Sequence, residues 1–374
     1  MSVSYGGDSI TFADGSVQSG GWTGFRNRII NGAMVIDQRN AGAAVSTGTN
    51  FYTLDRWNVL AQTSAKITVQ QNAGSVTPPA GFTKYLGITV GASASVTVGA
   101  TDQYLLRQGI EGFNMADLAW GTASAAPITI SFWVRSSLTG TFGGALKGGG
   151  GGSSYSYPFS FSISLANTWE QKTITIPGQT AGTWTTDNTL FTWVSFDLGV
   201  GSTYSGTANA WANTYYSGVT GAVKLIQTNS ATFYITGVQL ERGSTASSFE
   251  YRPYGTELQL CQRYCYVLRS ASTLSQVGFS SAQSTTTAFL GIYLPVTPRT
   301  NPTGITASSA TCLNSYAGNT NVTTTAIGVS SGWTFAGNFV TMQLTTAGSL
   351  VAGQISPTYF NSSTATIEFT GMEL

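Results

Sequence analysis

Two carboxylates, Asp187 and Asp197, are the residues in this sequence that could support hydrolytic chemistry. Glycoside hydrolysis needs a pair of carboxyl groups roughly 5 to 9.5 Å apart, and both residues lie near a stretch rich in Trp and Tyr. The 374-residue chain contains no His, which excludes a Ser-His-Asp triad, an imidazole base and a His-ligated zinc within it. Depolymerases are commonly built on long repeats, and no fixed-period repeat is present. We therefore expect no enzyme activity, with glycan depolymerisation as the catalytic alternative.

The three cysteines could in principle bind a metal or take part in redox chemistry. Cys261 and Cys265 lie four residues apart, as a metal pair might, and Cys312 leaves an odd count. Leu258 and Leu268 extend this pair to an apolar 3, 4, 3 spacing, which is typical of the buried face of a short helix. We predict buried thiols, no metal site and no cofactor, with a metal or redox role as the alternative.

A group of aromatic side chains between positions 184 and 216 could bind sugars. Sugars offer hydroxyls for hydrogen bonds and C–H faces that pack on rings, so a polar, uncharged surface with aromatics suits glycan recognition. The last four rings of the group lie in a Gly-, Ser-, Asn- and Thr-rich segment without alternation, which predicts a loop. Packing of these rings in the core or between subunits is the alternative. The glycan-binding candidates are Trp184, Tyr204, Trp211, Tyr215 and Tyr216, and Trp193 and Trp133 are further exposed-ring candidates.

Charge is scarce along the whole chain. Lys and Arg number 16 against 15 Asp and Glu, a formal net charge of +1, and charged residues make up 8% of the sequence, where globular domains average about 25%. No run of basic residues suits a phosphate backbone. No apolar run approaches the roughly 20 residues of a membrane span, and the first residues have no secretory leader pattern. We expect no nucleic-acid partner and no membrane insertion.

The elements that must position these residues are short strands. In Phe159–Leu165 and Ile128–Val134 apolar and polar residues alternate with period two, which predicts strands with one buried face. Many such strands separated by Gly, Asn, Ser and Pro indicate an all-β fold of antiparallel sandwiches or jelly rolls. Further predicted strands are 66–70, 85–90, 95–98, 172–176, 193–200, 222–226, 232–240, 289–294, 339–344 and 366–369.

Three local features predict how these strands are organised. The apolar phase flips at Gly237, which predicts a β-bulge. Thr256 and Gln259 match a capping box for a helix over 256–267, which we take as the joint between two β domains. Before residue 25 the sequence predicts a small hairpin that cannot bury a core alone.

Several segments, in order along the chain, resemble phage tail-fibre and related virion receptor-binding proteins. The strongest match is the run Thr236-Gly-Val-Gln-Leu-Glu-Arg-Gly243 through Phe249-Glu-Tyr-Arg-Pro-Tyr254 to Glu257-Leu258 and Leu260-Cys-Gln-Arg-Tyr264. Trp57 is expected to seal the sandwich and Arg56 to pair with a distant acid, with a ligand role as the alternative for this segment. Glu241-Arg242 and Glu250-Tyr-Arg252 are expected to form ion pairs at sheet edges. The other matching segments are Arg26-Asn-Arg-Ile-Ile-Asn-Gly32, Asp37-Gln-Arg39, Tyr52-Thr-Leu-Asp-Arg-Trp57, Arg107-Gln-Gly-Ile-Glu111, Ser131-Phe-Trp-Val-Arg-Ser136 and Thr168-Trp169.

The resemblance implies a fold and a place of action. It implies an N-terminal attachment segment (1–24), a jelly-roll β-sandwich like a carbohydrate-binding module (25–255), and a smaller β-sandwich domain opened by the helix (256–374). It also implies a homotrimer on the virion tail, made in the host cytoplasm and joined to other tail proteins through its N-terminal segment. The expected function is adsorption to a host-surface glycan, with a passive tail adaptor or spacer as the alternative.

Overall fold

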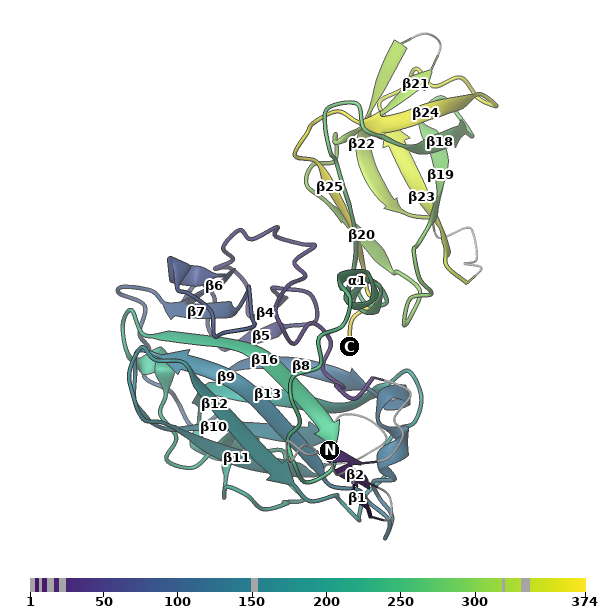
Figure 1. The fold of residues 1–374 in the computed structure, drawn as a ribbon. Helices are drawn as coiled ribbons and strands as arrows, with labels where there is room; N and C mark the ends of the chain where they lie inside the picture. Colours follow the sequence, from purple (N-terminus) through teal and green to yellow (C-terminus); the bar gives the residue numbers. More distant parts are fainter. Residues whose placement is uncertain are drawn as a thin grey trace.

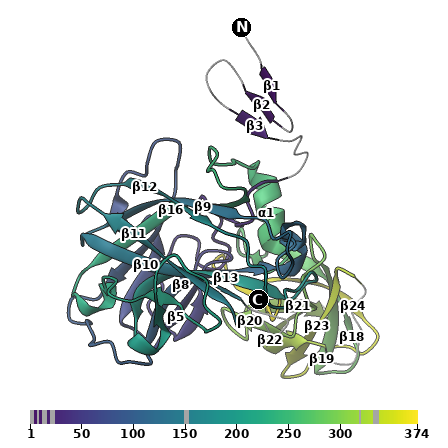
Figure 2. The ribbon, with the colours of Figure 1, turned by 90° about the horizontal axis from the view of Figure 1, so that it is seen from below.

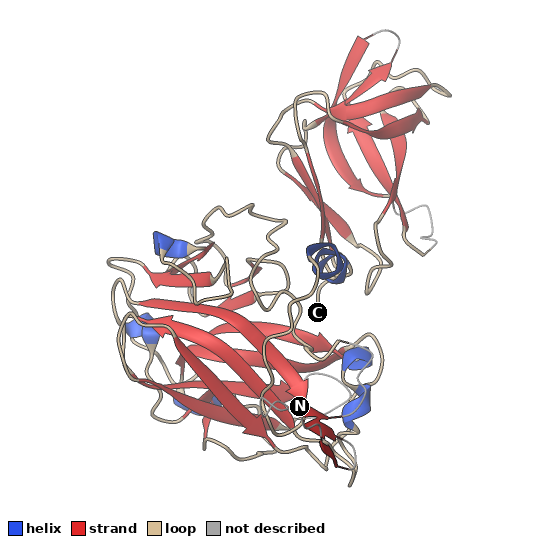
Figure 3. Ribbon diagram, in the orientation of Figure 1, coloured by secondary structure: helices blue, strands red, loops and turns tan. Residues whose placement is uncertain are grey.

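Two β-rich bodies joined by one helix make up the chain in the computed structural model (Figure 1). The structure describes residues 4–6, 9–11, 17–19, 25–148, 154–317, 320–330 and 337–374. Strands supply nearly all of the regular structure (Figure 3), so the predicted all-β class is confirmed. Among the described residues no helix is both long and apolar enough to cross a lipid bilayer.

The larger body is a sandwich of two antiparallel sheets. Eight of its strands, β7 to β13 and β16, can be numbered 1 to 8 in sequence order. One sheet then has the strand order 1-8-3-6 (β7-β16-β9-β12) and the facing sheet has 2-7-4-5 (β8-β13-β10-β11), which is the order of a jelly roll. The predicted jelly roll is therefore confirmed by strand order. The five-stranded sheet comprises β6 (Ile67–Gln71), β7 (Leu86–Val90), β9 (Ile128–Ser136), β12 (Glu170–Ile176) and β16 (Thr232–Arg242). The six-stranded sheet comprises β4 (Asn50–Tyr52), β5 (Asn58–Ala61), β8 (Gln103–Glu111), β10 (Gly140–Gly148), β11 (Ser156–Ile163) and β13 (Leu190–Val200).

The core between these sheets follows the alternation in the sequence. Ile130, Phe132 and Val134 of β9 are fully buried, and Phe132 packs edge-on against Phe196 of β13 across the sandwich. Trp57 is also fully buried in this core, as predicted. The inward positions of the two sheets thus form one apolar layer, and their outward positions remain for other roles.

A bulge interrupts β16 where the sequence predicts one. The register of β16 against β9 shifts between Thr236 and Gln239, and Gly237 has a φ of 61°. A Cβ at Gly237 would lie 2.5 Å from the Phe82 ring. Glycine is required here both by the left-handed backbone and by the close ring.

Two of the predicted strands are irregular. Residues 95–98 and 222–226 lie outside named strands and are joined by a hydrogen bond from Val96 N to Ile226 O. Leu225 and Ile226 belong to the sandwich core, and Val96, Val98 and Val223 pack against it. Burial rather than strand pairing therefore accounts for their apolar character.

The smaller body is a closed barrel, which corrects the prediction of a second sandwich. Its strands close in the order β18-β19-β23-β22-β21-β24, beside a three-stranded sheet. Closure pairs both edge strands, a property that alternation along single strands does not reveal. The barrel strands are β18 (Gln276–Ala282), β19 (Thr287–Tyr293), β21 (Leu313–Ala317), β22 (Thr320–Val329), β23 (Phe339–Thr346) and β24 (Ile355–Phe360). The adjoining sheet has β17 (Tyr266–Arg269), β20 (Gly304–Ala307) and β25 (Thr366–Thr370).

The helix between the bodies is shorter than predicted and is capped differently. Helix α1 spans Tyr254–Gln262, and its N-cap is Pro253, without a side-chain capping bond. The predicted capping box fails because Thr256 lies inside the first turn. The Glu257 carboxylate instead accepts hydrogen bonds from the Asn31 backbone and Arg252.

Helix α1 packs on the sandwich side of the joint. Cys261 and Tyr264 share an apolar cluster with Ile30 and Ile36. Leu374 at the C-terminus packs against the same cluster, and Figure 1 shows the C-terminus close to α1. In Figure 2 the C-terminus lies beside β13 and β20. Division of the chain at residue 255 stays a prediction, and these contacts give the helix a stabilising partner in the preceding domain.

Ion pairs fix the joint. Arg56, whose side chain is 1% exposed, binds the Glu373 carboxylate, so its predicted distant acid is found. Arg39 lies 2.7 Å from Glu368 and 3.1 Å from Glu373. Arg263 Nε donates to Glu111 at 3.0 Å. The scarce charges therefore concentrate where the two bodies meet.

The predicted ion pairs at sheet edges are only partly as expected. Arg252 lies 3.5 Å from Glu250, which confirms that pair. Arg242 lies 3.9 Å from Asp117, and Glu241 accepts hydrogen bonds from Ser247 and Gln239. The adjacent Glu241 and Arg242 point to opposite faces of β16 and so take separate partners.

The N-terminal segment contains a small sheet of its own. Strands β1 (Ser4–Gly6), β2 (Ser9–Thr11) and β3 (Val17–Ser19) pair antiparallel. The connection between β2 and β3 in the predicted hairpin region, residues 12–16, lies outside the described residues. An attachment role for 1–24 remains a prediction.

Candidate glycan-binding face

The carboxylate pair considered for hydrolysis is not brought together. Asp187 is exposed in the turn before β13, where hydrogen bonds from Thr189 hold its pKa below the usual range. Asp197 is buried seven residues beyond the start of that strand at Leu190. At about 3.3 Å per residue this places Asp197 roughly 23 Å from the start of β13, outside the range for paired glycosidase carboxylates.

Asp197 lies instead beneath the loop that connects β13 to β16. Burial raises its pKa to about 7, against the opposing effects of Lys224 and of backbone hydrogen bonds such as the one from Gly199. A Cβ at Gly218 would lie 2.2 Å from Asp197 Oδ2, so the loop closes directly over the carboxylate. The short strands β14 (Ser205–Gly206) and β15 (Gly218–Val219) belong to this loop.

The cysteines are buried, as predicted. Cys261, Cys265 and Cys312 are free thiols at most 3% exposed. Burial raises the pKa of all three, so the neutral thiol is favoured. In the part of the chain that the structure describes, no group of three or more His, Cys, Asp or Glu is placed to hold a metal ion.

Two of the five predicted glycan-binding residues are packing residues. Trp184 is 9% exposed and donates its indole N–H to Ala181 O. Trp211 packs edge-on against Trp120 at 5.3 Å and donates to Pro177 O at 2.9 Å. These rings form a cluster at one end of the sandwich, with their polar atoms satisfied by backbone carbonyls. The alternative of core packing therefore describes Trp184 and Trp211.

The other three lie along the loop. Tyr204 and Tyr216 are half-buried, and the Tyr216 ring packs against Gly206. Tyr215 is 41% exposed, and Lys147 of β10 lies with its Nζ 4.8 Å from the Tyr215 ring centroid. Of the five predictions, Tyr215 is the ring with the largest solvent-accessible share.

Tyr215 and Lys147 lead to a second ring and cation on the outer face of the six-stranded sheet. Lys147 is the cross-strand partner of Trp193 on β13. The guanidinium carbon of Arg107 on β8 lies 4.2 Å from the Trp193 ring centroid. Cross-strand partners point to the same face, so these side chains form one surface. We call Tyr215, Lys147, Trp193 and Arg107 the ring–cation patch.

Strand geometry and two Asn side chains hold Arg107 in place. Its Nε donates to Asn58 Oδ1 at 2.9 Å and its Nη2 to Asn50 Oδ1 at 3.4 Å. Gly109, opposite Trp193, has no side chain, and a Cβ there would lie 3.2 Å from the Trp193 ring. Lys147, Trp193 and Arg107 therefore project from paired strands, and the glycine at position 109 leaves room for the Trp193 ring.

Sequence reasoning found Tyr215 and Trp193 but missed Lys147 and Arg107. Lys147 stands alone before a glycine run, and β10 is too rich in Gly for alternation to reveal a strand. The sequence distinguishes Arg107 only as part of a segment that resembles tail-fibre proteins. Strand phase is the sequence signal for Trp193. This residue alternates with the inward-facing Val194 and Phe196, so its ring is expected on the outer face of the sheet.

Comparison with known proteins gives a limited result. No family model and no curated protein matches the chain. Among solved structures, a putative sugar binding protein from Bacteroides thetaiotaomicron is 11% identical, with 58% of this chain and all of that chain covered, at a TM-score of 0.35. The carbohydrate-binding module TmCBM61, solved with β-1,4-galactotriose, is 14% identical over 59% of this chain and 100% of its own, at 0.28.

A phage protein also occurs among these structures. The enzymatically active domain of bacteriophage CBA120 tailspike protein 4 is 11% identical over 58% of this chain, at a TM-score of 0.33, and the match spans 21% of that chain. Identities and scores this low say nothing about function, and the jelly-roll assignment rests on the strand order given above.

Proposed function

We propose that the chain is a structural protein of a phage tail fibre that binds a glycan on the host surface through the ring–cation patch. The observation that supports this proposal most directly is the patch itself. There Trp193 and Tyr215 lie on an outer sheet face beside the N–H donors of Arg107 and Lys147. Rings contribute apolar surface for sugar C–H groups, and the neighbouring polar groups fix orientation. The resemblance of the sequence motifs to tail-fibre proteins supports a location on the virion tail.

Binding without hydrolysis is part of this proposal. The separation of Asp187 from Asp197 along β13 leaves the one carboxylate pair suggested by the sequence unsuited to glycoside cleavage. Incubation of the chain with a bound polysaccharide should release no oligosaccharide. Release that is lost in Asp187→Asn would contradict this part of the proposal.

A bacterial glycan array tests the binding proposal. The parent chain should bind a subset of saccharides, and Trp193→Ala should lose that binding while its melting temperature stays near the parent value. Trp133→Ala is the matched control, because Trp133 is a half-buried ring on the outer face of the opposite sheet. Equal loss in both variants would exclude a specific role for the patch. A chain that binds no saccharide would favour the passive adaptor.

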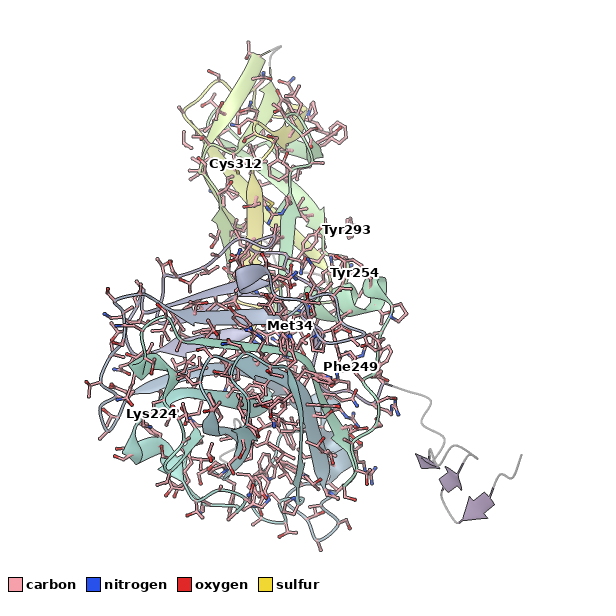
Figure 4. The ribbon with its side chains drawn as sticks, turned by 60° about the vertical axis from the view of Figure 1, so that its left-hand side comes forward. Met34, Lys224, Phe249, Tyr254, Tyr293 and Cys312 are labelled. Carbon is pink, nitrogen blue, oxygen red and sulfur yellow. The ribbon has the colours of Figure 1, made fainter. Side chains whose placement is uncertain are left out.

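We also propose a homotrimer in which the barrels of neighbouring copies contact one another. Phe279, Tyr293 and Ile355 on the barrel surface are 63%, 74% and 69% exposed, and Figure 4 shows Tyr293 at the surface. Arg299 is the sole charged residue in 270–367, and it donates to backbone carbonyls at the joint. A neutral apolar face meets its own copy without like-charge repulsion, which supports a second copy as its partner.

Light scattering tests this contact. Phe279→Asp combined with Ile355→Asp should reduce the assembly to a monomer at micromolar concentration. The control Leu165→Asp places one such negative charge on the sandwich, at a side chain that is 63% exposed. A parent chain that is monomeric at this concentration would refute the trimer. Attachment to other tail proteins through residues 1–24 is a further part of the proposal.

A further inference from the structure

Within the described residues, seven of the 14 Lys and Arg residues outside the ring–cation patch have a carboxylate partner, and the two cations of the patch have none. In the described ranges, neither Arg107 nor Lys147 forms an ion pair with a carboxylate. Their side chains are half-buried. The cations that do have a carboxylate partner are Arg28, Arg39, Arg56, Lys172, Arg242, Arg252 and Arg263.

The two charges also disfavour each other. Burial lowers the pKa of Lys147, and the positive charge of Arg107 lowers it further. Burial also lowers the pKa of Arg107. Two like charges partly removed from water are costly in any protein, and this chain has only 8% charged residues. Functional sites are where such unfavourable charge arrangements are commonly retained.

Arg107 is held in place by hydrogen bonds, and Lys147 contacts the Tyr215 ring. Arg107 is fixed by Asn58, Asn50 and the Trp193 ring, and these contacts use its Nε and Nη2. Within the described part of the chain no protein acceptor is found for Arg107 Nη1 or for Lys147 Nζ, and neither atom is among those buried without a partner. Arg107 Nη1 and Lys147 Nζ therefore keep N–H groups that no acceptor in the described part of the chain uses.

We propose that the ring–cation patch recognises an anionic sugar, whose carboxylate or phosphate oxygen lies between Arg107 and Lys147 while its ring contacts Trp193 or Tyr215. This inference rests on the proposed glycan-binding function and specifies the ligand class. A bound anion relieves the repulsion between the cations and accepts charge-assisted hydrogen bonds from both. A neutral sugar would leave that repulsion in place.

The same glycan array tests the inference when neutral, carboxylate-bearing and phosphate-bearing saccharides are scored separately. Bound saccharides should be anionic, and the carboxylate and phosphate sets identify which oxyanion is recognised. Arg107→Gln and Lys147→Gln should each weaken binding about 10- to 100-fold, the usual worth of a hydrogen bond to a charged group. Binding should also weaken as salt rises.

Arg135→Gln is the matched control. Arg135 lies over the Tyr234 ring at 5.4 Å on the outer face of the opposite sheet, and its Nε donates to Asn167 O. The Arg135→Gln variant should bind saccharides with the same affinity as the parent. If Arg107→Gln does not fold, Arg107→Lys replaces it as a variant that keeps the positive charge. The effect of removing a charge is then measured with Lys147→Gln alone.

The outcomes separate the two proposals. Preference for neutral saccharides, or undiminished binding by both Gln variants, overturns the anionic-sugar inference and leaves the binding proposal standing if Trp193→Ala still loses binding. Failure of the parent to bind any saccharide overturns both.

Discussion

Replacement of Trp211 by Ala should destabilise the sandwich without affecting glycan binding. Trp211 lies 5.3 Å from the ring centroids of both Trp120 and Tyr157, and its indole N–H donates to Pro177 O. Emptying a buried aromatic site costs about 3–5 kcal/mol. Because Trp211 is half-buried, we expect the lower end, about 3 kcal/mol in the free energy of unfolding.

This loss is large enough to measure. Each kcal/mol shifts the melting temperature of a domain of this size by roughly 2–4 °C, so Trp211→Ala should melt about 6–12 °C below the parent. Urea unfolding followed by circular dichroism should show a lower midpoint with an unchanged slope. Tyr215→Ala, from the same loop, is the control and should melt near the parent. A Trp211→Ala variant as stable as the parent would refute the assignment of this ring to packing.

Two further predictions concern buried charge. Asp197 keeps its proton to about pH 7 in the folded state and loses it near pH 3.9 when unfolded, so the folded state binds more protons between these values. Its contribution to the free energy of unfolding should therefore fall as pH rises from about 4 to 7. Asp197→Asn should remove that part of the pH dependence, and chemical denaturation showing equal slopes for parent and variant would contradict it. Glu373→Gln leaves the buried Arg56 guanidinium without its carboxylate, and thermal unfolding should reveal a loss of about 3 kcal/mol; a loss below about 1 kcal/mol would show that the joint does not depend on this pair.

Much of the sandwich could be predicted because its signals are local. The alternation in β9 and the phase flip at Gly237 depend on near neighbours in sequence, and both match the structure. Trp57 and Arg56 were also predicted correctly, since a large ring and a scarce charge each need burial or a partner. The identity of that partner, Glu373, depends on how the chain returns to the joint, which no local pattern records.

The candidate site was only partly predictable because it depends on neighbouring strands. A Trp in an irregular loop can lie open or pack down, and the rings of Trp120 and Tyr157 that decide this for Trp211 are distant in sequence. Lys147, Trp193 and Arg107 meet through the pairing of β10, β13 and β8. Barrel closure was missed for the same reason, since it depends on which strands meet last.

The most direct test of the account is the affinity of the full chain for its best saccharide on the array, measured by titration calorimetry for the parent, Trp193→Ala and Trp133→Ala. Trp residues at the centre of a binding site typically contribute 2 kcal/mol or more, so we predict that Trp193→Ala weakens the Kd by about 30-fold or more. Trp133→Ala should bind within about twofold of the parent. A folded Trp193→Ala variant with the affinity of the parent would contradict the claim that this face of the sandwich binds the glycan.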